Sequence, residues 1–307
     1  MLVKVLGSAA GGGFPQWNCA CRNCVDVRRG VAGLKPRSQS SLAVSADGAN
    51  WVLLNASPDL RQQLAAHQAL APSADGPLRG SPLKAVVLTN ADVDHVAGLL
   101  NLREVQPFHL YASGRVLAAI AANPIFGVLQ EDIVMRVPVA NGQIFEAAGC
   151  PGLAIELFAV PGKIALYLED PDAGPQFGSG EGDVVGLKLV NRKTGRFICY
   201  IPGCAEVDDR IRRRIEGASA LFFDGTLFED EEMIALGLSQ KSGRRMGHIS
   251  ISGKDGSIAR LADAKLGRRI FIHINNSNPV LREDSAERRA ALAAGWEIAE
   301  DGMEIRL

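Results

Sequence analysis

Three potential metal ligands lie within four residues of one another, directly after an apolar segment. Asp92, Asp94 and His95 follow residues 84–88, which have the pattern of a buried strand. Ligands gather at the carboxyl ends of strands in open α/β sheets. Because Asp92 and Asp94 alternate with apolar neighbours, their side chains can share one side of the loop. A second apolar run ends at His273, and we assign this histidine to the same site rather than to a hydrogen-bonded place in the core.

Three of the six cysteines, Cys19, Cys21 and Cys24, form a second cluster. Thiols this close together cannot all pair in disulfides, whereas thiolates suit a tetrahedral zinc ion with Zn–S bonds of about 2.3 Å. We favour a structural zinc in a clip loop over residues 14–37, and its fourth ligand must come from elsewhere in the fold. Cys199 lies in an apolar run and is interpreted as a core thiol.

Composition limits the function classes. The 307 residues include 33 Lys and Arg against 34 Asp and Glu, and this balance argues against general nucleic-acid binding, which needs a basic excess. No apolar run approaches the about 18 residues of a membrane span. The first residues lack a signal peptide, so we expect a cytoplasmic protein. With only five histidines, a metal site must rely on carboxylates and sulfur as well. We assign His67 and His109 to structure.

The elements that would position these side chains are short strands with helices between them. The expected strands are residues 2–6, 40–46, 51–55, 84–88, 108–112, 155–160, 164–169, 184–190, 196–201, 219–223, 268–274 and 303–307. The expected helices lie near residues 59–69, 113–122, 206–216, 254–263 and 282–294. This mixture predicts a layered α/β architecture with mixed sheets.

Two stretches, residues 71–82 and 170–183, lack an apolar period and are expected loops. The second is long for a compact chain, and we keep two interpretations of it, a lid over the site and a disordered surface insert. Residues 191–195 join two apolar runs and predict a hairpin turn.

Residues 89–95 resemble the metal loop of the metallo-β-lactamase superfamily, which reads T-H-x-H-x-D-H. Asp94 and His95 keep this pattern. Asn90 and Asp92 replace its first two histidines, so one of the two usual metal sites has lost ligands.

Further positions of the superfamily pattern are also changed. Lys163 stands where a further histidine is usual, and Cys204 lies near the place of the bridging aspartate, whereas His273 matches the final histidine. A lysine cation would repel a second metal. The resemblance therefore predicts one metal ion, held by Asp94, His95 and His273, with Asp92 as a nearby oxygen donor. Two imidazoles and a carboxylate with open positions are typical of non-haem iron oxygen chemistry, and zinc, manganese or copper would fit as well.

The whole chain is similar to one branch of this superfamily, the coenzyme PQQ synthesis protein B family. The segments that carry the resemblance are residues 7–19, 222–226, 246–250, 272–279, 295–299 and 301–304. It implies one metallo-β-lactamase-like domain over residues 1–307, an αββα sandwich with two mixed β-sheets flanked by helices. It also implies a role in making pyrroloquinoline quinone (PQQ), through Fe(II)-dependent oxygenation of a tyrosine ring. The expected partners are O2 and a small-molecule precursor derived from tyrosine and glutamate.

The same resemblance suggests roles around the metal. His248 would be a proton donor or acceptor near the ring, or else a surface histidine. Asp224 would support the site through hydrogen bonds. Lys163, with Arg244 or Arg245, would pair with carboxylates of the substrate, and a solvated surface is the alternative for the arginines.

The fourth ligand of the cysteine clip stays open. In phosphodiesterase relatives with the same clip it is a histidine, and the matching position here is Asn276. Asparagine is a poor zinc ligand. The clip therefore uses either another donor or three thiolates with a weak oxygen of Asn276.

Two other functions remain as alternatives. The first is a binding, carrier or transport-release protein for PQQ or its precursor, because degenerate catalytic sites often become binding sites. The second is a metal-dependent hydrolase or phosphodiesterase, which needs a metal-activated hydroxide and usually two metal ions. The sequence leaves a homodimer open.

Overall fold

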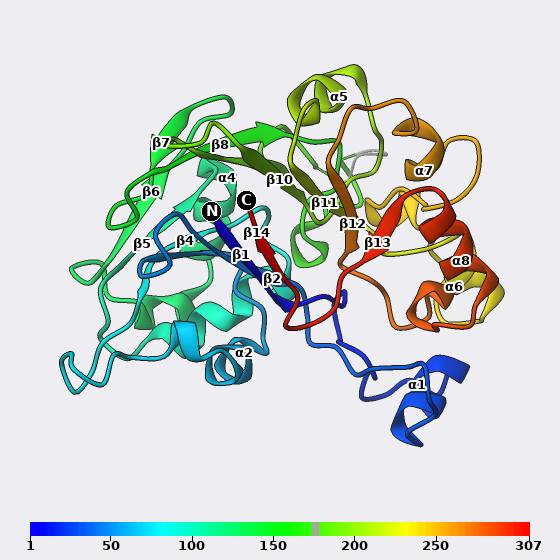
Figure 1. The fold of residues 1–307 in the computed structure, drawn as a ribbon, viewed down its shortest axis with the longest axis horizontal. Coiled ribbons are helices and arrows are strands. Elements are labelled where there is room, and N and C mark those ends of the chain that lie inside the picture. The colour runs from blue at the N-terminus through cyan, green and yellow to red at the C-terminus, as the bar shows by residue number, and fades with distance from the viewer. Residues whose placement is uncertain (174–177) are drawn as a thin grey trace.

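The computed structural model describes residues 1–173 and 178–307, which form two seven-stranded β-sheets (Figure 1). The first sheet has the order β14-β1-β2-β3-β4-β5-β6 and the second the order β13-β12-β11-β10-β9-β8-β7. The strands of the first sheet are β1 (Leu2–Gly7), β2 (Ser41–Ser45), β3 (Trp51–Leu54), β4 (Leu83–Val87), β5 (Phe108–Ala112), β6 (Val134–Pro138) and β14 (Glu304–Arg306). Those of the second are β7 (Ile144–Glu146), β8 (Leu153–Ala159), β9 (Val185–Asn191), β10 (Phe197–Ile201), β11 (Ala220–Asp224), β12 (Arg268–Ile272) and β13 (Trp296–Ile298).

Both sheets are mixed, as predicted. In each, three antiparallel pairings are followed by three parallel ones, which run from β3 to β6 in the first sheet and from β10 to β13 in the second. Parallel neighbours present their carboxyl ends at the same edge of a sheet. The loops that follow β4, β11 and β12 therefore leave the strands at edges where ligands usually bind.

The main hydrophobic layer lies between the sheets. On β2, Leu42 and Val44 belong to this layer, whereas the intervening Ala43 faces the helices outside the first sheet. On β8, Ile155 and Leu157 point inward in the same way. This alternation follows from the two-residue repeat of a strand. Both sheets therefore bury one face against each other and the other face against helices.

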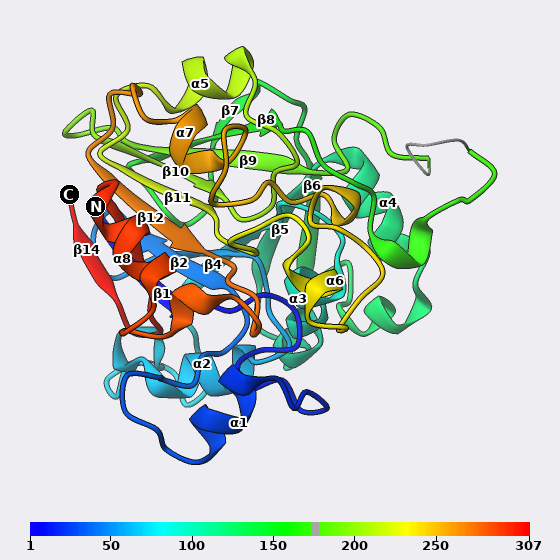
Figure 2. The same cartoon turned by 90° about the vertical axis from the view of Figure 1, so that its right-hand side faces the viewer.

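Helices cover both outer faces, and Figure 2 shows α2 on one side of the sheets and α5 on the other. The helices are α1 (Arg22–Arg28), α2 (Leu60–Ala66), α3 (Val93–Val96), α4 (Gly114–Ala121), α5 (Asp209–Ile215), α6 (Glu232–Ala235), α7 (Ser257–Arg260) and α8 (Ala286–Ala293). Three of them begin at capping side chains that accept a main-chain N–H, namely Ser113, Asp208 and Ser285. Such caps satisfy donors that a helix cannot pair internally. The αββα sandwich is confirmed.

One predicted strand is wrong. Residues 164–169 form an irregular segment with a single 3₁₀ turn, Leu166–Leu168. Both edges of the nearby β9 are already paired, with β8 and β10, so no strand is available as a partner. The sequence also missed β6, β7 and β13, which all lie at or next to sheet edges and carry polar as well as apolar side chains. The predicted hairpin turn at 191–195 is confirmed between β9 and β10.

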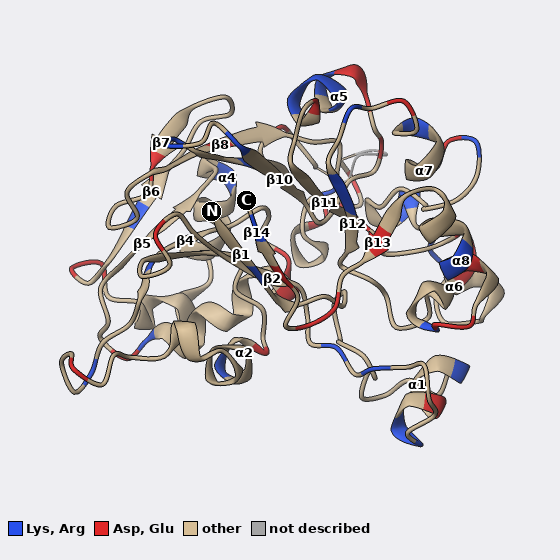
Figure 3. Cartoon of the chain, in the orientation of Figure 1, with Lys and Arg blue, Asp and Glu red and all other residues tan. Residues whose placement is uncertain are grey.

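Charges of both signs are spread over the outer helices and loops (Figure 3). Within the described ranges, no helix combines the length and apolar character needed to cross a membrane. The two ends of the described chain meet at β1 and β14, where the amino group of Met1 donates to the carbonyl of Leu307 at 2.7 Å.

Core packing behind the second sheet gives a stability test. The Trp296 ring lies flat on Phe271 with 3.9 Å between ring centroids and is 1% exposed. We expect Trp296→Ala to lower the free energy of unfolding by about 3–5 kcal/mol, because it leaves a large cavity. The control is Trp17→Ala: Trp17 is 86% exposed, and its loss should change the free energy by about 0.5 kcal/mol or less. Urea unfolding followed by circular dichroism measures both, and similar losses in the two variants would contradict this account.

Candidate metal centre

Asp94, His95 and His273 come together at the facing edges of the two sheets. Their ligand atoms lie within 4.8 Å of one another. The Nε2 atom of His273 is 2.9 Å from Oδ2 of Asp94, and the Nε2 atom of His95 is 3.8 Å from the same oxygen. The Nε2 atom of His95 is buried and has no hydrogen-bond partner among the residues that the structure describes. A buried, unpartnered imidazole nitrogen beside a carboxylate fits a metal ligand, because such an atom is otherwise costly to bury.

Both imidazoles are held by their other nitrogen. Nδ1 of His95 lies 2.7 Å from Oδ1 of Asn90, and Nδ1 of His273 lies 2.9 Å from the hydroxyl of Thr226. Since the amide oxygen only accepts, the Nδ1–H of His95 donates to it, and Nε2 keeps its lone pair. Asn90 is thus a positioning residue where the sequence showed only a lost ligand. Outer hydrogen bonds of this kind fix the tautomer of metal-binding histidines.

The charge states around the cluster suit a metal. Burial lowers the pKa of His95 to about 4, although the charge of Asp94 opposes this shift. Burial alone would raise the pKa of Asp94, but His95 and His273 hold it well below its usual range. At neutral pH, His95 is therefore neutral and Asp94 ionised, which are the forms that bind metals.

Asp92 lies next to this cluster without joining it. Asp92 precedes α3, and its N–H donates to Oδ1 of Asn90 at 3.0 Å. Burial, helped by the charge of Asp94, raises the pKa of Asp92 to about 6. The ligand-atom clusters found in the described part of the chain do not include it. Its predicted part as an oxygen donor stays a prediction.

His248 belongs to a hydrogen-bonded network centred on Asp224. The carboxylate of Asp224 is fully buried; one oxygen accepts the hydroxyl of Thr226 at 2.7 Å, and the other lies 2.7 Å from Nδ1 of His248. The ring of His248 stacks on that of His273, with 5.2 Å between centroids. Burial would lower the pKa of His248, but the charge and hydrogen bond of Asp224 raise it. Such a pair can transfer a proton.

The other substituted positions have structural partners. Lys163 forms an ion pair with Glu169, a residue that the sequence analysis did not single out. The thiol of Cys204 is buried and lies 3.1 Å from the carbonyl oxygen of Glu206. The main-chain N–H of Cys204 donates to the carboxylate of Asp224 at 2.9 Å. Burial raises the pKa of this thiol. Cys204 therefore supports the Asp224 network through its backbone.

The side chain of Asn276 contacts all three sulfurs of the cysteine clip. The amide Nδ2 of Asn276 lies 3.1 Å from the sulfur of Cys19, 3.6 Å from that of Cys21 and 3.3 Å from that of Cys24. Its loop is tied to α1, because the side chain of Asn23 donates to the carbonyls of three successive residues from Asn276 onward at 3.0–3.1 Å. A rotation of the Asn276 amide would present its oxygen to an ion held by the sulfurs.

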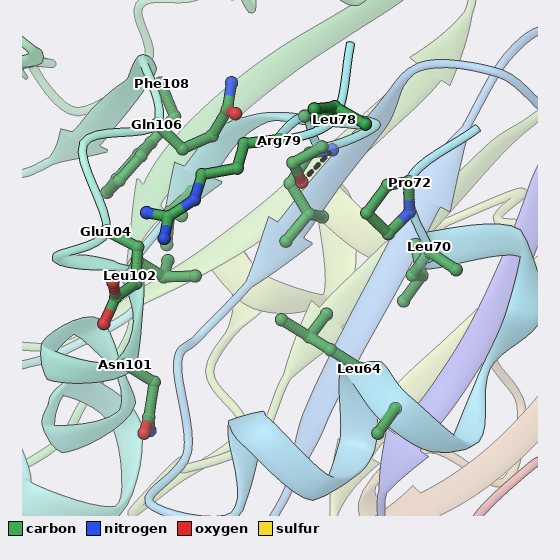
Figure 4. A pocket seen from close by; sticks show the side chains of 16 residues that line it. Leu64, Leu70, Pro72, Leu78, Arg79, Asn101, Leu102, Glu104, Gln106 and Phe108 are labelled. Atoms are coloured by element: carbon green, nitrogen blue, oxygen red, sulfur yellow. Dashed lines mark hydrogen bonds between the residues drawn. The ribbon is translucent and has the colours of Figure 1, made fainter. Parts of the chain in front are cut away.

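A spacious apolar cavity of about 480 Å³ lies elsewhere (Figure 4). It is lined by residues such as Leu64, Leu83 and Phe108, and the latter two begin β4 and β5. This is the end of the strands opposite to the metal ligands. A smaller cavity of about 340 Å³ is lined by His248 and Arg244 and adjoins the candidate centre.

The loop at 170–183 contains residues 174–177, which lie outside the described residues. The two interpretations of this loop, a lid and a disordered surface insert, both stay predictions. In the described residues 178–183, Asp183 forms an ion pair with Arg115 at 2.7 Å. This ion pair anchors the end of the loop to α4.

Comparisons with known proteins show the family to which the chain belongs. The profile of the Beta-lactamase superfamily domain matches residues 50–274. Coenzyme PQQ synthesis protein B of Methylorubrum extorquens strain PA1 is 52% identical over 307 residues, with all of both chains covered. The protein of the same name from Bradyrhizobium diazoefficiens is 50% identical over 309 aligned positions and 99% of each chain.

Solved structures show the same fold. The crystal structure of Zn(2+)-bound PqqB from Methylobacterium extorquens covers all of both chains at 51% identity with a TM-score of 0.95. A diphosphatase of the PhnP family, at 20% identity and a TM-score of 0.66, shares the fold. This chain therefore belongs to the coenzyme PQQ synthesis protein B family of the β-lactamase superfamily.

Proposed function

We propose that this protein acts in PQQ biosynthesis as a metal-dependent enzyme that oxygenates a tyrosine-derived ring. One Fe(II) ion would be held by Asp94, His95 and His273. The buried, unpartnered Nε2 of His95, beside a carboxylate and a second imidazole, is the observation that carries this proposal. The relatives' name and the zinc-bound relative support a metal site in a PQQ pathway protein.

The chain's own residues prepare this site. A bound Fe(II) would supply the activation of O2. Asn90 and Thr226 hold His95 and His273 with their Nε2 atoms directed to the ion. The hydrogen bond from Nδ1 of His248 to Asp224 leaves Nε2 of His248 to exchange a proton with the phenol of the substrate. The O2-dependent insertion of one oxygen atom leaves the other as water and consumes two electrons, so the reaction takes a reductant as well.

A metal-dependent hydrolase is the second candidate. Asp224, His248 and His273 form another cluster with ligand atoms within 4.8 Å, which could hold a second ion. Hydrolases of this kind usually need two metals. A third function, carrying PQQ or its precursor, requires tight binding without turnover.

We also propose that Cys19, Cys21 and Cys24 bind a structural zinc ion with Asn276 as fourth ligand. The three sulfurs lie within 4.8 Å of one another, and the Asn276 amide is in contact with all of them. Zinc would favour the amide oxygen over the nitrogen.

The reaction class is tested by loading the active site with Fe(II) without oxygen, in protein that keeps the zinc of the clip. A phenolic substrate such as L-glutamyl-L-tyrosine and ascorbate are then added in oxygenated buffer. We expect oxygen uptake and a product heavier by one oxygen atom, detected by mass spectrometry. His248→Gln should slow this reaction by about 10²–10⁴-fold. Iron-loaded protein without ring oxidation would exclude the oxygenase, and hydrolysis with two active-site metals per chain would favour the second candidate.

The separation of the two metal sites is tested by counting metals. His273→Ala should remove the active-site ion and keep the zinc of the clip, because no ligand is shared between the sites. Cys24→Ala is the reciprocal variant and should remove only the clip zinc. Metal content per chain is measured by plasma mass spectrometry. Loss of both ions from folded His273→Ala protein would show that the sites are coupled.

The role of Asn90 is tested by metal affinity. Asn90→Ala removes the acceptor that orients His95, and we expect the affinity for Co(II), as a spectroscopic probe, to fall by about 10–100-fold. Asn90→Asp keeps an acceptor oxygen and should restore most of the affinity and the visible spectrum. An unchanged affinity in Asn90→Ala would mean that packing alone orients His95.

A further inference from the structure

Three cations converge on one carboxylate beside the candidate centre. Arg245 places Nη2 3.2 Å from one oxygen of Glu169 and Nη1 3.4 Å from the other. The ammonium of Lys163 contacts the same carboxylate, and that of Lys241 is 3.9 Å away. The Glu169 side chain is only 11% exposed and that of Lys163 15%. This cation cluster, defined as Lys163, Lys241 and Arg245, has two positive charges more than Glu169 neutralises.

The cluster lies next to the metal loop. The charge of Lys163 acts on the carboxyl of Asp92. Gly247, at φ +91°, packs so closely on Lys163 that an added Cβ would lie 3.2 Å from its Cβ. The next residue is His248, whose ring stacks on His273. A ligand that contacts the cation cluster can thus reach the metal loop and His248.

Glu169 lies at the end of a strap, residues 163–169, that contacts the metal loop. The hydroxyl of Tyr167 donates to the carbonyl of Ala91 at 2.9 Å. Leu166 is 61% exposed and Tyr167 44%, whereas Ala165 is buried and Leu168 packs against the core. The strap is therefore held by both apolar and polar contacts, and the polar contacts include the ion pairs of Glu169 with Lys163, Lys241 and Arg245.

The lysine donors of the cluster exceed what one carboxylate can use. Each lysine has three N–H donors, while Glu169 offers two oxygens. Lys241, at 3.9 Å, makes an ion pair without a hydrogen bond to Glu169. Hydrogen bonds from Arg245 and Lys163 lower the pKa of Glu169 to about 2, so the cluster strongly favours an ionised carboxylate. A planar guanidinium flanked by ammonium groups is a recognition site for carboxylates.

We propose that Lys163, Lys241 and Arg245 form a carboxylate-binding subsite, and that Glu169 fills it as an internal ligand until a carboxylate of the substrate displaces it. The substrate class is then a phenol that carries a carboxylate, whose ring lies at the metal loop. The identity of this substrate rests on the proposed function, whereas the binding of the carboxylate needs neither iron nor O2.

The experiment compares two probes that differ in one group. The first is 3-(4-hydroxyphenyl)propionate, and the second is its amide, which has the same ring and no charge. Calorimetry measures both at low salt with protein that keeps the zinc of the clip and receives no active-site metal. We expect the carboxylate to bind and the amide to bind much more weakly. If Glu169 fills the subsite in about nine of ten molecules, Glu169→Gln should tighten carboxylate binding about tenfold, because the internal competitor is removed.

Two further variants and one control complete the test. Lys241→Ala and Arg245→Ala should each weaken binding of the carboxylate probe and leave that of the amide unchanged. The control is Glu156→Gln. Glu156 lies on β8, outside the cation cluster, and its partly buried carboxylate forms an ion pair with Arg214. Loss of this ion pair should change the affinity for neither probe.

The outcomes separate the subsite from the oxygenase. Folded Glu169→Gln protein that binds the carboxylate no better than the wild type would show a structural ion pair and overturn the proposal. Equal binding of both probes would overturn it as well. Carboxylate-selective binding in a protein that fails the oxygen-uptake assay would keep the subsite and reject the proposed reaction.

Discussion

The contact between Asp94 and His273 is the interaction on which the candidate centre depends. It joins residues 179 positions apart, at 2.9 Å, and connects the loop after β4 to the end of β12. The strands belong to different sheets, so the contact exists only when the two sheets pack face to face. The apolar layer between the sheets therefore supplies the free energy that brings the ligands together.

The backbone at His273 shows what this placement costs. His273 has φ 59°, a left-handed conformation that costs a non-glycine residue about 1–3 kcal/mol. Hydrogen bonds of the two residues that follow hold it there. Ile274 donates to the carbonyl of Ser8 and accepts from the N–H of Ala10, and Asn275 donates to the carbonyl of Thr226. Residues 8–10 near the amino terminus thus brace the site.

The substitutions that distinguish this chain from a two-metal enzyme have local roles. Asn90 orients His95, and the main-chain N–H of Cys204 donates a hydrogen bond to Asp224. Lys163 pairs with Glu169 and places a positive charge beside the metal loop. Asn90, Cys204 and Lys163 therefore each hold or charge a group at the candidate centre.

The sequence by itself determined the local parts of this protein. The apolar run before Asp92 and the spacing of Asp94 and His95 predicted a strand that ends at a metal loop, and the cysteine spacing predicted a clip. These signals are short-range, since they follow from strand periodicity and from the geometry of neighbouring ligands. Resemblance to known proteins supplied the αββα arrangement.

Only the tertiary structure decided which distant residues complete each group. Asn276 contacts cysteines that are more than 250 positions away in the sequence, and Glu169 contacts Arg245, which is 76 positions away. The edge strands β6 and β7 escaped detection because their half-exposed faces lack a clear apolar period. Such contacts are set by how the sheets and their loops pack, and the identity of a polar residue does not reveal its partner until the packing is known.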